Sequence, residues 1–151
     1  MKLTKQQLES GTEIKKVLRE RAIKAANIAN TAMHSSHEID DAAFYNGRRD
    51  AYRRVVSSID YISEKSHIAK PFVGKLIHHL QGVREQTVMV FFADGVGTSY
   101  GYGRLGVFDE TLETLDRMYR SMYRIDGKTP IPLSKGGGFF VVTPECHSGS
   151  E

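Results

Sequence analysis

Arg48 has the clearest chemical implication of any residue in this sequence, because it falls within the apolar stripe of a predicted helix over residues 44–62. At about 100° per residue, five apolar side chains of this segment lie within about 80° of one another, and Arg48 projects into the same arc. They are Phe44, Ala51, Val55, Ile59 and Ile62. A guanidinium does not lose its proton, so an inward Arg needs a carboxylate, carbonyl groups or a bound anionic ligand.

An anion supplied from outside the chain would make Arg48 part of a phosphate pocket. A carboxylate of the same chain in contact with Arg48 would remove that argument. Two further cations, Arg49 and Arg53, lie on the polar side of the helix, whereas Arg54 can pair with Asp50 at i, i+4 spacing. The arginines predict binding of a phosphate-bearing ligand, either a nucleotide-like small molecule or nucleic acid.

A glycine-rich segment over residues 93–108 contains a G-x-G-x-x-G pattern at Gly101, Gly103 and Gly106. A dinucleotide-binding fold needs a strand that ends at the first glycine and a helix that begins inside the pattern. Here eight residues separate Phe92 from Gly101, and the next helix is expected to begin only at Asp109. We therefore do not expect a dinucleotide site.

Two interpretations of residues 93–108 stay open. The segment is either a lid whose tyrosines stack on a base or ring, or an ordinary glycine-rich turn whose tyrosines pack on the surface. With the lid interpretation, the predicted ligand-binding residues are Arg48, Arg49, Arg53, Tyr100, Tyr102 and Arg104.

Motifs for other chemistry are weak. His34 and His37 have the only histidine spacing that even weakly matches a metal site, so we expect no metal and no cofactor. Residues 127–129, Gly-Lys-Thr, resemble the end of a phosphate-binding loop, but Met122 stands where that loop needs glycine. No nucleophile motif is present, and an enzyme would have to use scattered groups such as Asp94 or His79. We expect a binding protein rather than an enzyme.

The elements that would position these residues follow from periodicity. Helices are predicted over 4–33, from Ser36 or Asp40 to about Ile62, and over 71–81, with Gly82 as a stop. Apolar runs at 87–92 and 138–143 predict strands, and 109–123 predicts a further helix. The fold class is thus α+β: three N-terminal helices, then a small, mainly antiparallel sheet with one more helix. We expect one domain over 1–144 and a tail over 145–151.

Composition and charge set further bounds. Apolar residues make up 40% and charged residues 26%, as in ordinary globular proteins. Residues 1–85 hold 15 Lys and Arg against 10 Asp and Glu, a net charge of +5, and the remaining residues hold 6 against 8, a net charge of −2. No apolar stretch is long enough for a membrane span, no signal peptide is recognisable, and Cys146 is the only cysteine. We expect a cytoplasmic protein with no membrane partner.

Three functions remain open. The leading one is a non-enzymatic binding protein for a phosphate-bearing ligand, the second a helical module for protein interaction or homo-oligomerisation, and the third a small nucleotide-acting enzyme. The short, cysteine-poor chain, with Phe-Tyr-Asn-Gly-Arg-Arg-Asp-Ala-Tyr at 44–52, is similar to small accessory proteins of bacterial viruses. That resemblance implies a role in sequestering or inhibiting a host component.

Overall fold

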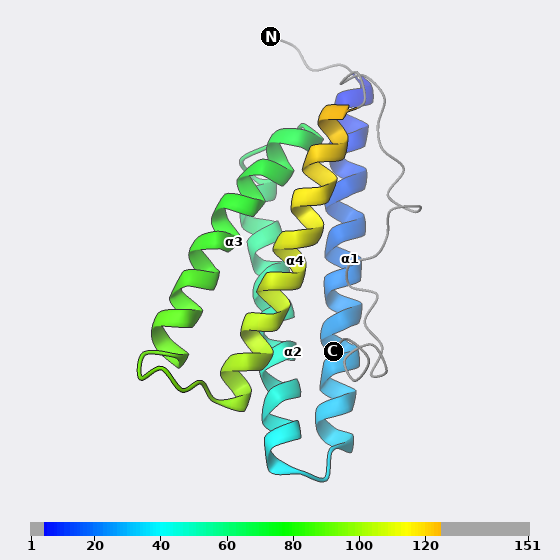
Figure 1. Ribbon diagram of the computed structural model, residues 1–151. Helices are drawn as coiled ribbons and strands as arrows, with labels where there is room; N and C mark the ends of the chain where they lie inside the picture. The colour runs from blue at the N-terminus through cyan, green and yellow to red at the C-terminus, as the bar shows by residue number, and fades with distance from the viewer. Residues whose placement is uncertain (1–4, 125–151) are drawn as a thin grey trace.

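Residues 5–124 are described by the computed structural model and form four α-helices (Figure 1). They are α1 Lys5–Ser35, α2 Ile39–Ser63, α3 Ala69–Phe91 and α4 Ser99–Arg124. Successive helices are antiparallel, so α2 and α4 run in the same direction (Figure 1). These two pack directly on each other, with α1 against α2 and α3 against α4. The α1–α2 and α3–α4 connections lie at the same end of the bundle.

The core consists of one apolar stripe from each helix, which explains why these segments fold as helices. In α1 the stripe is rich in alanine, and short side chains let α2 approach closely. The buried apolar residues of α1 are Ile14, Leu18, Ala22, Ala25, Ala26 and Ala29. In α2 the predicted stripe is confirmed for Ala51, Val55, Ile59 and Ile62, which are all buried.

The prediction of an α+β fold is wrong for the described residues, which contain no strand. Residues 87–92 were expected to form a strand but continue α3, which ends at Phe91. Thr87 lies one turn after Val83 on the buried stripe, and its hydroxyl donates to the Val83 carbonyl at 3.0 Å. The helix also passes through Gly82, because a single exposed glycine costs only about 1 kcal/mol in a helix.

The prediction of a glycine-rich lid or turn over residues 93–108 is also wrong in extent, because α4 begins at Ser99 and not at Asp109. The connection after α3 is short. Gly95 adopts a φ of 82°, and the Asp94 carboxylate accepts the Val96 N–H at 3.0 Å. Thr98 then caps α4, since its hydroxyl oxygen accepts the Gly101 N–H at 3.0 Å. The pattern Gly101, Gly103, Gly106 therefore lies within a helix.

The start of α2 also differs from the prediction. α2 begins at Ile39, and its N-cap position is held by Glu38 without a side-chain cap, instead of by Ser36 or Asp40. The predicted strand over 138–143, the tail over 145–151 and the C-terminal part of the 1–144 domain lie outside the described residues. Among the described helices, none is both long and apolar enough to span a bilayer.

Candidate functional site

Arg48 points into the bundle as predicted, and only 2% of its surface is exposed. Its Nη2 donates to the Tyr52 hydroxyl at 3.0 Å and to Oε1 of Glu110, on α4, at 3.0 Å. The guanidinium also lies 5.7 Å from the ring centre of Phe44 and 5.6 Å from that of Tyr52. Its counter-charge thus comes from the same chain. The argument for a phosphate pocket at Arg48 loses its basis.

The glycines of α4 explain how Glu110 reaches Arg48. A Cβ on Gly103 would lie 2.1 Å from the Phe44 carbonyl oxygen, and a Cβ on Gly47 would lie 2.1 Å from the Tyr100 carbonyl oxygen. The two helix backbones therefore touch at this crossing, where no side chain fits between them. One turn further on, Gly106 leaves space for the guanidinium, with Arg48 Nη1 3.1 Å from a Cβ placed there. The G-x-G-x-x-G pattern is a helix-packing feature in this chain.

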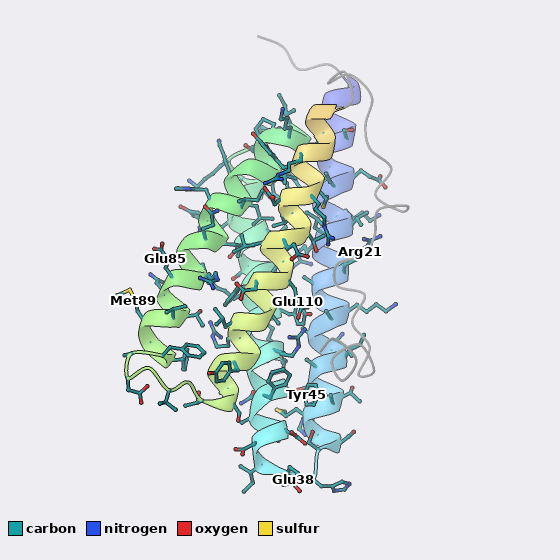
Figure 2. All side chains as sticks on the ribbon, in the orientation of Figure 1. Arg21, Glu38, Tyr45, Glu85, Met89 and Glu110 are labelled. Atoms are coloured by element: carbon teal, nitrogen blue, oxygen red, sulfur yellow. The ribbon has the colours of Figure 1, made fainter. Side chains whose placement is uncertain are left out.

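Tyr52 completes the buried group around Arg48. Burial is the main cause that raises the pKa of Tyr52 to about 12, and the negative charge of Glu110 adds to it, while Arg48 acts in the opposite sense. The phenol is therefore neutral at physiological pH, and its oxygen accepts a hydrogen bond from Arg48. Figure 2 shows Glu110 on the side of α4 that faces α1. This group holds α2 and α4 together.

A second polar network surrounds Arg49. Its guanidinium donates to Asn30 of α1 at 3.0 Å, to the neighbouring Asn46 and to Asp50 at 3.1 Å. Asp50 in turn accepts the Tyr100 hydroxyl at 2.6 Å. The network therefore ties α1, α2 and α4 together through neutral amides and one carboxylate. Arg49 makes its described contacts within the chain.

Tyr100 and Arg104 extend this network along α4. Burial and the hydrogen bond to Asp50 raise the pKa of Tyr100, so the phenol remains protonated. Nη1 of Arg104 lies 3.5 Å from the Tyr100 hydroxyl, and its guanidinium lies 5.8 Å from the Phe91 ring centre and 5.6 Å from that of Phe108. Both side chains are partly buried and belong to the first turns of α4, not to a lid.

The six predicted residues thus separate into two groups. Arg48, Arg49, Tyr100 and Arg104 lie at the contact between α2 and α4, although Arg48 belongs to one network and the others to the second. Arg53 and Tyr102 are exposed, and neither belongs to these networks. The structure therefore brings four of the candidates together as internal contacts.

His79 and Asp94, the two acid–base candidates named for a nucleotide-acting enzyme, lie apart in the structure. His79 lies on α3 beside Tyr61, with ring centres 5.4 Å apart, and burial lowers its pKa. Asp94 follows the end of α3, and the 12 residues from His79 to Phe91 alone span roughly 18 Å of helix. Within the described residues, no cluster of three or more His, Cys, Asp and Glu has the arrangement of a metal site.

A surface that the sequence reasoning missed lies at the end of α3. Four of the seven large apolar side chains that are exposed in the described part fall within residues 89–102. They are Met89, Val90, Val96 and Tyr102, which we call the α3-end surface. The Tyr102 ring packs edge-on against Phe92, with ring centres 4.9 Å apart. The apolar run at 87–92 was a signal for this surface, but it was interpreted as a buried strand.

Val90 is the most informative member of the α3-end surface. It follows Val83 by seven residues, so it lies on the same stripe of α3. Val83 is 6% exposed, whereas Val90 is 69% exposed. Figure 1 shows the reason, since α3 diverges from α2 toward its C-terminal end. A position of the core stripe therefore has no neighbouring helix to cover it.

Comparisons of the chain with protein families, with curated proteins and with solved structures found no match.

Proposed function

We propose that this chain is a helical interaction module that binds another protein through the α3-end surface. The observation that carries the proposal is Val90, a core-stripe residue left 69% exposed. Met89, Val96 and Tyr102 are further exposed apolar side chains within residues 89–102. Clustered exposed apolar side chains on a folded domain are typical of interaction sites, whereas scattered ones are not. A partner that packs there would continue the stripe of α3.

Binding of a phosphate-bearing ligand remains a prediction, with less support than the interaction module. Three of its four arginines, Arg48, Arg49 and Arg104, contact carboxylates or aromatic rings of the chain itself. Arg53 is exposed, but a single surface arginine supplies little affinity or specificity. A melting temperature that rises with nucleotide concentration would favour this function. Self-association and inhibition of a host component likewise remain predictions.

The proposal is tested by comparing two serine variants. Val90→Ser removes the central apolar side chain, and Ile39→Ser is the matched control, because Ile39 is 86% exposed but lies at the start of α2. Each variant and the original chain would be used as bait in a lysate of the source cells, and captured proteins would be quantified by mass spectrometry. We expect a captured protein that Ile39→Ser retains and Val90→Ser loses.

Direct binding of that protein, purified, would then be measured by calorimetry. The expected result is a dissociation constant at least about tenfold weaker for Val90→Ser, because a central apolar contact is worth more than about 1 kcal/mol. Equal affinity of Val90→Ser and the original chain for every captured protein would overturn the proposed function.

A further inference from the structure

Two exposed carboxylates, those of Glu85 and Asp94, lie close in the sequence to the α3-end surface. Glu85 lies one turn before Met89, and Figure 2 shows both side chains on the outer side of α3, pointing away from the bundle. Asp94 lies in the connection between α3 and α4. Glu85 and Asp94 form no ion pair with a described cation.

Most cations of this end are paired with carboxylates of the chain. Arg48 pairs with Glu110, Arg49 with Asp50, and Arg84 with Asp109. Arg104 has no carboxylate partner among the described residues, but it is partly buried among aromatic rings. Although the whole chain carries a formal charge of +3, the end that exposes Val90 therefore presents uncompensated negative charge. Because no described cation pairs with Glu85 or Asp94, their negative charge can attract an approaching cationic partner.

We infer that the occupant of the α3-end surface is a cationic amphipathic helix of a partner protein. This inference rests on the proposed function and specifies its partner. A helix fits, because the exposed stripe residue Val90 continues the spacing by which α3 packs against other helices through Val83 and Thr87. Apolar residues at helical spacing would contact Val90 and Met89, and flanking Lys or Arg residues would face Glu85 and Asp94.

The same charges disfavour other occupants. In a two-fold dimer through this surface, Glu85 and Asp94 would face the same residues of the second copy, and like charges repel. Nucleic acid and anionic lipid surfaces are likewise repelled by an acidic rim. A cationic helix is the partner whose charge and apolar pattern both match.

The test uses a synthetic peptide of about 18 residues composed of leucine and lysine, with leucine at helical spacing. Two control peptides share its length: one with glutamate in place of lysine, and one with the same composition but a scrambled order. Binding to the full chain is followed by chemical shifts of backbone amides. We expect a dissociation constant of roughly 10–100 µM for the leucine–lysine peptide, with shifts confined to residues 83–102.

Charge reversal at the site provides the matched pair of variants. Glu85→Lys with Asp94→Lys should weaken peptide binding at least about tenfold, whereas Glu13→Lys with Glu20→Lys, two exposed positions on α1, should change it less than about twofold. Equal effects of the two pairs, equal binding of the leucine–glutamate peptide, or shifts outside the stated residues would overturn the inference.

Failure of the inference differs from failure of the proposed function. If the captured natural partner is lost with Val90→Ser but binds equally well to Glu85→Lys with Asp94→Lys, the surface is an interface and its partner is not cationic. If Val90→Ser leaves every natural partner bound, the proposed function itself fails, whatever the peptide does.

Discussion

At the scale of the residue, Arg48 and Glu110 form a pair with unequal access to water. The side chain of Arg48 is 2% exposed and that of Glu110 is 52% exposed. A carboxylate released from the pair can be hydrated where it stands, but a released guanidinium stays buried with the Tyr52 hydroxyl as its remaining described hydrogen-bond partner. Removal of the Glu110 carboxylate should therefore lower the free energy of unfolding more than removal of the Arg48 guanidinium.

The corresponding prediction compares Glu110→Ala with Arg48→Met. We expect Glu110→Ala to lower the free energy of unfolding by about 1–3 kcal/mol, and Arg48→Met, which fills the same space without a charge, by less than about 1 kcal/mol. Urea denaturation measures both changes. The control is Glu113→Ala, which removes a carboxylate one turn along α4 that pairs with Arg117 on the surface. We expect this control to lower the free energy of unfolding by no more than about 0.5 kcal/mol. A larger loss for Arg48→Met than for Glu110→Ala would contradict this account.

At the scale of the element, α4 owes its position to residues that weaken an isolated helix. Glycine costs about 1 kcal/mol relative to alanine in a helix interior, and the first turns of α4 hold Gly101, Gly103 and Gly106. This loss of helix stability is offset where the backbones of α2 and α4 touch, because Gly103 lies against the Phe44 carbonyl. The helix is thus stabilised by its contact with α2 more than by its own sequence.

Two glycine-to-alanine variants separate these effects. Gly103→Ala should destabilise the chain by about 1–3 kcal/mol, because the new methyl group meets the backbone of α2 and forces the helices apart. Gly82→Ala, in α3 with open space around it, should stabilise by about 0.5–1 kcal/mol. Thermal and urea unfolding would measure both, and a stabilising Gly103→Ala would show that the two backbones are not in contact.

Helical spacing makes some features of this structure predictable from the sequence, whereas contacts between residues far apart in the sequence are not. The inward side of α2 and the position of Arg48 follow from helical spacing over many residues, and both were correct. Residues 87–92 are too few to distinguish a strand from the end of a helix by their apolar pattern. The glycines of α4 favour a loop locally, and the carbonyl of Phe44 that makes them necessary lies far away in the sequence. The carboxylate chosen by Arg48 was unpredictable for the same reason.

At the scale of the whole molecule, the bundle is closed at one end and open beside α3 at the other. Tyr61 of α2 packs near His79 in the middle of α3, but α2 no longer covers α3 at Val90. Few buried apolar contacts hold the last turns of α3, so they should open locally at a lower free energy than the centre of the bundle.

Hydrogen exchange followed by NMR tests whether the free energy of local opening falls along α3 toward its C-terminal end. We expect the amides of residues 88–91 to exchange with a free energy of opening at least about 2 kcal/mol below that of residues 76–83 on the same helix. Val90→Ser should leave the slow amides of residues 76–83 unchanged, because its side chain contributes little to the core. Uniform protection along α3 would mean that its end is covered in solution.

The backbone contacts of α2 and α4 at Gly47 and Gly103 also limit how the chain can misfold. If α4 slipped by one turn along α2, a shift of about 5.4 Å, in the direction that moves Tyr100 to the place of Gly103, a side chain would meet the α2 backbone. The same slip would carry Glu110 away from Arg48 and leave a bare cation in the core. Bundles joined only by interchangeable aliphatic residues tolerate several axial alignments, whereas the contacts of Gly103 and Glu110 disfavour a slip in this direction.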